Sequence, residues 1–195
     1  MKKLLALSII VLAAIFLLIQ RNDAKTESTV VAKKFNGFES QAKWGEHLVT
    51  VGGCHDCHSP KKMTARGPEI DSSLLLAGHI AGSPEPVADK KELQAKGLVL
   101  TSDLTTWIGP WGTSYTANLT SDATGTGNWK EQQFMLAIRE GKSKGLANAR
   151  NLLPPMPWQM YRNFTDDELK AIFAYLKATK PVKNLVPPPL PPVSK

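Results

Sequence analysis

The only two cysteines of the chain, Cys54 and Cys57, are separated by two residues, and His58 follows the second directly. Two thiols and an imidazole so close together can bind a metal, exchange disulfides or hold a cofactor. On a helix, side chains three positions apart are neighbours, so the two sulfur atoms would lie one helical turn apart. The stretch VGGCHDCHSP is therefore where we expect chemistry.

The pattern Cys-x-x-Cys-His is the attachment signature of c-type haem. Each thiol adds across one vinyl group of the haem, and the histidine that follows binds the iron from one face. The sequence thus predicts one heme c per chain, with Cys54 and Cys57 as thioethers and His58 as the proximal iron ligand.

Three other uses of the cysteine pair fit the sequence less well. A thioredoxin-type disulfide needs a strand before the pair, whereas a helical pattern precedes it here. A structural zinc ion needs about four ligands, and only His47, His55 and His79, none at a standard spacing, could complete the set. A simple structural disulfide would leave the adjacent His58 unexplained.

A haem iron also needs a sixth ligand or an open site. Met156 lies in the segment LPPMPW, where the flanking prolines favour a stiff, extended backbone that offers one side chain. A methionine thioether raises the reduction potential and suits electron transfer. Met156 is the predicted distal ligand. Met160, a histidine or an open site remain the alternatives at this position. Met156 could also have only a structural role, as a side chain that fills a gap in the core.

Aromatic side chains are frequent in this loop-rich chain. Some could wall the haem edge or bond its propionates, although ordinary core packing explains any single one equally well. Arg139 could pair with a propionate or simply be an exposed helix residue. The aromatic residues concerned are Trp107, Trp111, Trp129, Trp158 and Tyr161.

Helical patterns flank the cysteine pair and the methionine segment. We expect helices over residues 40–51 and 129–140, the second ending at Gly141. The clearest helix begins at the capping box opened by Thr165 and continues with apolar residues at helical spacing. Residues 59–128 are predicted to be a loop-rich connection with one or two short helices, such as 87–96. Because so long a run is unusual in a compact domain, it is expected to wrap something that need not be protein.

The two ends of the chain differ from the middle. Residues 1–20 combine Lys2 and Lys3 with an apolar run of sixteen residues, which predicts a signal anchor or a cleaved signal peptide. Such a helix is about 24 Å long, somewhat short of a hydrocarbon core of about 30 Å. A tether over 21–38 follows, and the tail 181–195 is rich in proline, either solvated or lying over the domain as a strap. The chain is thus expected at the outer face of the cytoplasmic membrane or in the periplasm.

The charge of the chain bears on its partners. The formal net charge is +7, a mild basic excess that favours acidic protein partners or anionic surfaces. No dense run of Lys and Arg interleaved with aromatics is present, so nucleic acid is not expected as a partner.

The chain resembles the class I cytochromes c. Residues 45–48 before 54–58 are similar to the N-terminal helix and haem site of that family, and Met156, with the helix TDDELKAIFAYLK after it, is similar to its distal loop and last helix. The resemblance implies a mostly α fold, with a single domain over 39–180. It also implies that the two helices cross closely, with Gly45 against Tyr175.

A narrower resemblance is to bacterial cytochrome c subunits associated with membrane dehydrogenases for alcohols and gluconate. Those subunits usually carry several haem motifs, and this chain has one. The resemblance implies a non-enzymatic electron carrier with a dehydrogenase or a terminal oxidase as redox partner. The alternatives are a haem enzyme or gas sensor with an open distal site, or a thiol oxidoreductase. The motifs that carry the resemblance are ANLT (117–120), GTGNW (125–129), QF (133–134), REG (139–141), PMPW (155–158) and AYL (174–176).

Overall fold

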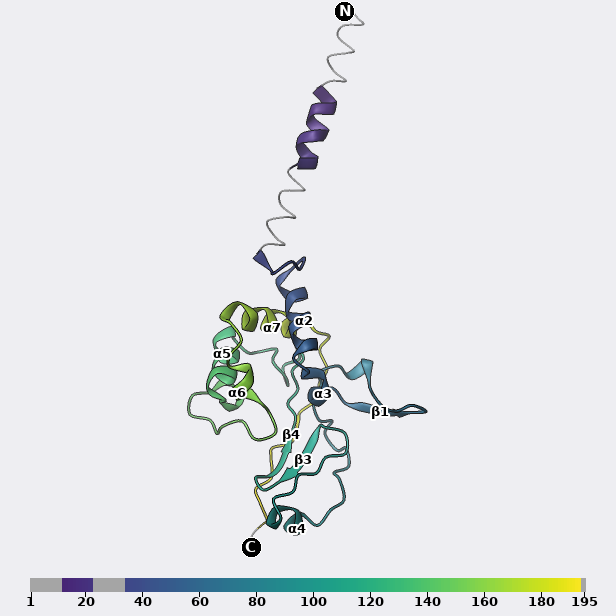
Figure 1. Cartoon of the computed structure of the whole chain (residues 1–195), viewed down its shortest axis with the longest axis vertical. Helices are drawn as coiled ribbons and strands as arrows, with labels where there is room; N and C mark the ends of the chain where they lie inside the picture. Colours follow the sequence, from purple (N-terminus) through teal and green to yellow (C-terminus); the bar gives the residue numbers. More distant parts are fainter. Residues whose placement is uncertain (1–11, 23–33, 194–195) are drawn as a thin grey trace, which may run out of the picture.

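The computed structural model describes residues 12–22 and 34–193. The described part is mostly helical, as predicted, and it also contains two small antiparallel sheets that were not predicted. Figure 1 shows helices α2, α5, α6 and α7 grouped at one end of the domain, with β3, β4 and α4 at the other. The helices are α2 (Gln41–Val51), α3 (Cys54–His58), α4 (Lys90–Ala95), α5 (Glu131–Glu140), α6 (Trp158–Tyr161) and α7 (Asp166–Ala178), with 3₁₀ turns at Ser72–Leu74 and Ser143–Gly145. The strands are β1 (Lys61–Thr64), β2 (Gly67–Ile70), β3 (Thr106–Gly109) and β4 (Gly112–Tyr115).

The predicted helix before the cysteine pair is confirmed as α2. It begins after Ser40, whose hydroxyl accepts a hydrogen bond from the Lys43 amide at 3.2 Å, as an N-cap residue should. Its buried face contains Trp44, Gly45, Leu48 and Val49. This face forms one side of the hydrophobic core.

The expected close crossing of the first and last long helices is also confirmed. A Cβ atom built on Gly45 would lie 1.8 Å from the carbonyl oxygen of Ala171 and 2.9 Å from the Cβ of Tyr175. Only a glycine on α2 therefore lets the backbone of α7 approach this closely. The crossing fixes the direction in which α2 delivers the chain to the cysteine pair.

The helices α5 and α7 follow their sequence signals closely. Thr165 and Glu168 form the predicted capping box at the start of α7. Gly141 ends α5 with φ +65°, in the left-handed region that favours glycine. The rings of Phe134 and Phe173 stack with their centroids 5.4 Å apart, which joins the two helices to the core shared with α2.

The middle segment contains more regular structure than predicted. The two hairpins β1–β2 and β3–β4 lie there, and α4 is shorter than the helix expected over 87–96. Each hairpin turns over two residues and then enters a glycine with positive φ, Gly67 or Gly112. The middle segment is loop-rich with one short helix, as predicted, but the hairpins were not predicted because strands of four residues are too short for a clear period-two pattern.

The proline-rich tail lies over the domain as a strap in its described part. The amide and carbonyl of Leu190 pair with Thr113 of β4 at 2.9 Å each. A Cβ on Gly112 would be 2.1 Å from the Leu190 carbonyl oxygen, so the strap lies directly on the hairpin turn. Asn184 is buried at 7% exposure. Of the two arrangements that the sequence allowed, the packed one is found.

The structure does not describe residues 1–11 and 23–33. Part of the predicted N-terminal anchor and most of the predicted tether therefore lie outside the described residues. Residues 12–22 are helical, with apolar side chains such as Phe16 and Leu17 more than half exposed. Within the described ranges, every helix falls short of the length and apolar character that crossing a bilayer requires.

Candidate functional site

The cysteine pair and the histidine lie together on α3, a single short helix. Gly53 precedes it with φ +66°, a left-handed conformation that lets the chain turn sharply out of α2. Both thiols are free, and Cys54 packs against the core cluster. Because Cys54 and Cys57 are three positions apart on a helix, their side chains lie on neighbouring positions.

His58 is buried, and a hydrogen bond fixes its tautomer. Its Nδ1 atom lies 2.8 Å from the carbonyl oxygen of Ala117. A carbonyl can only accept, so Nδ1 carries the proton and Nε2 presents its lone pair. Burial lowers the pKa of His58 despite the hydrogen bond to Ala117, which acts in the opposite direction. A neutral imidazole with its second nitrogen bonded to a backbone carbonyl is the usual state of a histidine that ligates a metal.

Two segments of the middle region hold His58 from both sides. The Gly78 amide donates to the His58 carbonyl at 2.8 Å, and the His79 amide donates to the Thr116 carbonyl at 3.0 Å. A Cβ on Gly78 would lie 2.5 Å from Ala117 backbone atoms, and its φ is +72°, so the position requires glycine. The middle region thus packs around His58, and the expectation that it wraps a group other than protein stays a prediction.

The strap locks these segments in place. The side-chain amide nitrogen of Asn184 donates to the carbonyls of Ala77 and His79 at 2.7 and 2.8 Å, and its oxygen accepts from the Ala81 amide at 3.1 Å. The side-chain amide of Asn118 in turn donates to the Val182 carbonyl at 2.8 Å. The tail of the chain therefore fixes the loops that fix His58.

The thiols do not have the surroundings of reactive cysteines. Burial raises the pKa of Cys54 to about 11 and raises that of Cys57 as well. A nucleophilic or redox-active cysteine has a lowered pKa, because the thiolate is the reacting form. Within the ranges that the structure describes, no three or more His, Cys, Asp or Glu side chains gather where they could hold a metal ion.

The predicted distal methionine lies on the same core as the cysteine pair. Met156 is partly buried and packs against the cluster that Cys54 also contacts, whereas Met160 is 72% exposed. Just before Met156, the Pro154 carbonyl accepts from the Ser114 hydroxyl at 2.7 Å. These contacts favour Met156 over Met160 as a residue held in a defined position.

The helix after Met156 ties the distal segment to the start of α3. The Tyr161 hydroxyl donates to the Gly52 carbonyl at 2.6 Å, two residues before Cys54. A Cβ on Gly141 would lie 2.4 Å from the Trp158 ring, so this indole packs flat against the end of α5. The segment after Met156 thus contains the short helix α6. This helix was not predicted, because the prolines before it interrupt any helical pattern in the sequence.

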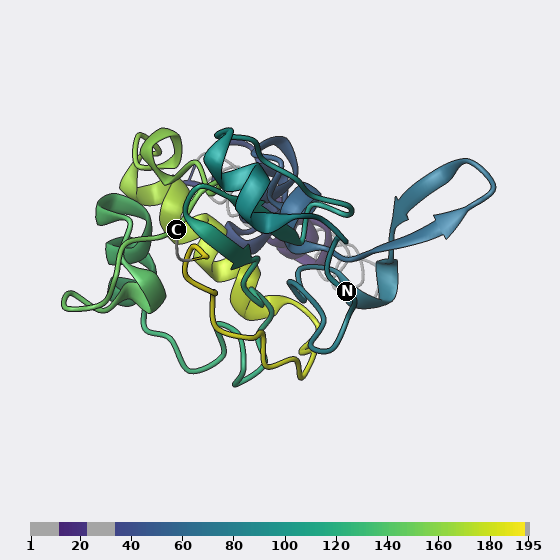
Figure 2. The same cartoon turned by 90° about the horizontal axis from the view of Figure 1, so that it is seen from below.

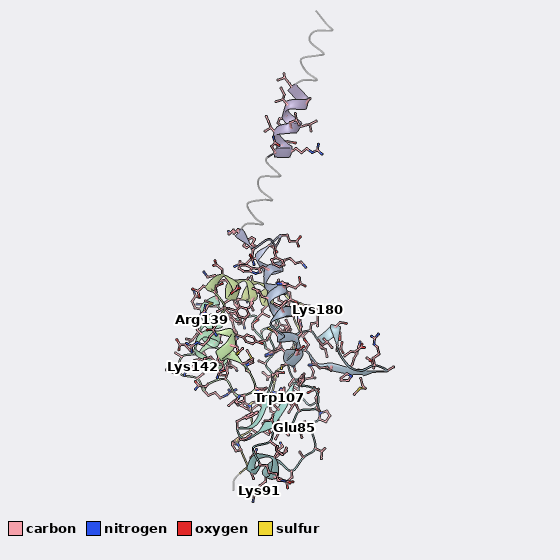
Figure 3. The ribbon with its side chains drawn as sticks, in the orientation of Figure 1. Glu85, Lys91, Trp107, Arg139, Lys142 and Lys180 are labelled. Carbon is pink, nitrogen blue, oxygen red and sulfur yellow. The ribbon has the colours of Figure 1, made fainter. Side chains whose placement is uncertain are left out.

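Several other predicted residues are engaged within the protein. Arg139 pairs with Asp166 at 2.6 Å and bonds the Arg162 carbonyl, so it joins α5 to the start of α7. Figure 3 shows Arg139 on the α5 side of the domain and Trp107 on β3. The Trp107 indole donates to the Leu104 carbonyl at 2.7 Å.

His47 and His79 make their contacts away from α3. His47 is exposed and lies against Phe38, with ring centroids 5.0 Å apart. His79 is 3% exposed, and its Nδ1 lies 2.9 Å from the Thr106 hydroxyl and 3.1 Å from that of Thr105. They are a surface and a packed histidine, as expected.

One buried hydroxyl is left without a partner among the described residues. Thr116 Oγ1 is enclosed and makes no hydrogen bond, and Thr116 is adjacent to Ala117, which accepts from His58. A buried polar atom normally has a partner, so a polar group of a bound cofactor would fit beside it. Together with two free thiols and an oriented imidazole, the residues present fit a c-type haem.

Sequence reasoning missed the residues that position His58 rather than bind to it. Ala117 and Asn118 lie in the ANLT motif that carries the family resemblance, but nothing in the motif shows that a carbonyl is the functional group. Gly78 and Asn184 act through backbone contacts far apart in the sequence, which one sequence without relatives cannot show.

Comparison with known proteins gives partial but consistent matches. No protein-family model matches the chain. One of the subunits of a nicotinate dehydrogenase from Pseudomonas putida is 39% identical over 79 residues, which is 40% of this chain and 6% of that protein. The cytochrome c subunit of a gluconate 2-dehydrogenase from Pantoea cypripedii is 30% identical over 70% of this chain and 23% of its own length. The cytochrome subunit of a fructose dehydrogenase from Gluconobacter japonicus is 37% identical over 71% of this chain and 21% of its own length.

These matches confirm the resemblance that the motifs indicated, within clear limits. The matched region spans about a quarter or less of each of these relatives. Alcohol dehydrogenase cytochrome c subunits match over 75% of this chain, at 25% identity. Over most of its length, the chain is thus a homologue of the cytochrome c subunits of gluconate, fructose and alcohol dehydrogenases.

Proposed function

We propose that the chain is a cytochrome c-like electron carrier that holds one covalent haem and passes single electrons from a dehydrogenase to an acceptor. Cys54 and Cys57 would attach the haem, and His58 and Met156 would ligate its iron. The haem domain would span 39–180, with the tail from 181 lying over it. The chain itself would catalyse no chemical step on a substrate. When bound, the haem supplies the one-electron Fe(III)/Fe(II) couple.

The observation that carries the proposal is the hydrogen bond from His58 Nδ1 to the Ala117 carbonyl. It holds the proton on Nδ1 and leaves Nε2 as a ligand atom, on the same helix as two free thiols. Burial of His58 keeps the imidazole neutral and excludes water from it. No disulfide, zinc or thiol function needs all three of these features.

The distal assignment rests on the way the methionine segment is held. A rigid carrier must keep its ligands in place in both redox states, and Met156 lies between two anchors, the Ser114–Pro154 bond and the Tyr161–Gly52 bond. Ligation by a thioether would set a higher potential than a second histidine.

We place the carrier in the cell envelope, attached through the apolar N-terminal run. The exposed apolar side chains of residues 12–19 support an anchor or an export signal, since such a surface has no use in water. A dehydrogenase as electron donor is supported by the names of the homologues. The basic excess of the chain would favour an acidic docking surface on that partner.

The test is the absorption spectrum of the full chain purified from membranes of its source, oxidised and reduced, with a pyridine haemochrome assay. We expect the α-band of c-type haem and a cofactor that resists acid–acetone extraction. Haem that is extracted, or absent, would refute the proposal.

The ligand assignment is tested with Met156→Ala, with Met160→Ala as its matched control. The first change should abolish the charge-transfer band between methionine sulfur and ferric iron, and the second should leave it intact. Rapid carbon monoxide binding by the reduced wild-type protein would instead favour an open distal site, and with it a haem enzyme or a gas sensor.

A further inference from the structure

The hairpin β1–β2 projects from the domain immediately after the cysteine pair. Figures 1 and 2, seen from two perpendicular directions, both show it extending away from the body. The sheet has only these two strands, so in the described part of the chain neither strand has a further partner. A two-stranded hairpin alone is marginally stable in water, and one kept in this form usually has a face to bury.

The two faces of the hairpin differ in character. Residues opposite each other in an antiparallel pair lie on the same face. The register pairs Met63 with Pro68 and Lys61 with Ile70, which gives one apolar face with a lysine at its base. The opposite face carries Lys62 paired with Glu69 and Thr64 paired with Gly67. This division is typical of a sheet that covers something apolar on one side only.

The apolar face is nevertheless uncovered. Met63 is 80% exposed, Ile70 is 37% exposed and Pro68 is also exposed. Methionine is enriched at protein interfaces, where its flexible side chain adapts to a partner. The exposure of these side chains leaves the hairpin ready to pack against another surface.

The apolar face is coupled directly to α3. The ammonium group of Lys61, which shares this face, donates to the Asp56 carbonyl within the Cys-x-x-Cys-His turn. The Asp71 amide donates to the Pro60 carbonyl at 2.8 Å and closes the base of the hairpin two residues after His58. A molecule seated on the apolar face would therefore lie beside the site proposed for the haem.

We propose that the β1–β2 hairpin is a docking arm for the electron-donating dehydrogenase, which would cover Met63 and Ile70 with an apolar patch bordered by carboxylates. This inference rests on the proposed function. The carboxylates are inferred from the charge of the hairpin: Arg66 pairs with Glu69 at 2.7 Å, and Lys61 and Lys62 remain as an excess of positive charge. Opposite charges at the rim steer association and fix register, while the apolar centre supplies most of the affinity.

A protein fits this arm better than a lipid surface. The hairpin has no Trp, Tyr or Phe, the residues favoured at membrane interfaces. The test below separates a dehydrogenase from a membrane and from a second copy of this chain.

The kinetic test compares two double variants of the full-length chain. Met63→Ser with Ile70→Thr removes the apolar face, and Val87→Ser with Leu98→Thr removes two exposed apolar side chains elsewhere as the control. Reduction is followed with membranes of the source organism lacking this chain, supplied in turn with gluconate, fructose and ethanol. We expect the hairpin variant to be reduced about tenfold or more slowly, and the control within about twofold of wild type. Both should retain full haem and normal reduction by ascorbate; hairpin and wild-type rates that agree would overturn the proposal.

A second measurement does not depend on haem. A photo-crosslinking amino acid replaces Met63 in cells of the source organism, with Val87 replaced in a control strain. A crosslink from position 63, and not from 87, to a dehydrogenase subunit supports the proposal even if the chain carries no haem, in which case only the proposed cofactor fails. Crosslinks to lipid, to a second copy of this chain, or to nothing would overturn the docking arm while leaving the haem untouched.

Discussion

Replacing Gly45 by alanine tests whether the approach of α2 to α7 sets the stability of the domain. The added methyl group would lie 1.8 Å from the Ala171 carbonyl oxygen and 2.5 Å from its carbonyl carbon. Ordinary contacts of a Cβ atom begin near 3.4 Å. The helices must therefore separate by about 1.6 Å at the crossing, and the atoms in the way belong to the backbone and cannot rotate aside.

The magnitude follows from two opposing effects. Adding atoms to a well-packed core typically lowers the free energy of unfolding by 1–3 kcal/mol. Because the obstructing atoms belong to the backbone, we expect a cost of about 3 kcal/mol for this change. The higher helix propensity of alanine offsets about 1 kcal/mol of this cost, because glycine is less favourable inside a helix. We therefore expect Gly45→Ala to lower the free energy of unfolding by about 2 kcal/mol, which for a domain of this size is a fall in Tm of about 4–8 °C.

The assay is urea unfolding of the purified chain, followed by circular dichroism. Val51→Ala, a change at a 64% exposed position of the same helix, is the control and should stay within about 0.5 kcal/mol of wild type. Adding Ala171→Gly to the Gly45 variant should not rescue it, because the obstacle is a carbonyl group. A Gly45 variant as stable as wild type, or a rescue by the second change, would refute the reasoning.

Three further predictions concern the contacts around the site. Asn184→Ala removes three hydrogen bonds, two of them to the buried carbonyls of Ala77 and His79 and one to the amide of the exposed Ala81. It should cost about 2–3 kcal/mol in urea unfolding, since each lost bond is worth about 1 kcal/mol. Tyr161→Phe removes one hydrogen bond and should cost about 1 kcal/mol, measured in the same way. Hydrogen bonds from Lys90 and Tyr115 lower the pKa of Glu85, so the folded state binds that proton more weakly than the unfolded state. The stability that this carboxylate contributes is present above its pKa in the unfolded state and is lost as the pH falls through its pKa in the folded state. Glu85→Gln should therefore reduce the fall in the free energy of unfolding at acid pH. An unchanged fall at acid pH would contradict this prediction.

The long helices could be predicted because their signals are local. The capping box at Thr165, the glycine after α5 and the apolar spacing of α2 each lie within one element. The Cys-x-x-Cys-His motif is local as well, since Cys54, Cys57 and His58 lie within five residues on α3. Gly45 against Tyr175 is not local, and only the family resemblance led to it.

The hairpins and the strap could not be predicted, because their signals are weak or distant. The two-residue turns of the hairpins are Ala65-Arg66 and Pro110-Trp111 rather than the Asn-Gly or Asp-Gly pairs that mark two-residue hairpin loops. Asn184 lies more than a hundred residues from the carbonyls that it bonds. The hydrophobic pattern within one element does not show which distant positions are in contact in the fold.

The residues that were predicted to be a connection are those that orient His58. An imidazole on a helix of five residues would be free to rotate unless its second nitrogen were held, and the Ala117 carbonyl holds it. That carbonyl is itself fixed because Gly78 packs against it and Asn184 anchors the chain on either side of Gly78. Loosening any link in this series should let the imidazole turn before it unfolds the helices, since α2, α5 and α7 supply all the buried residues of the core cluster except Leu76. The loop-rich middle and the tail are therefore the part of the chain in which ligand geometry, and with it the potential of a bound haem, would be set.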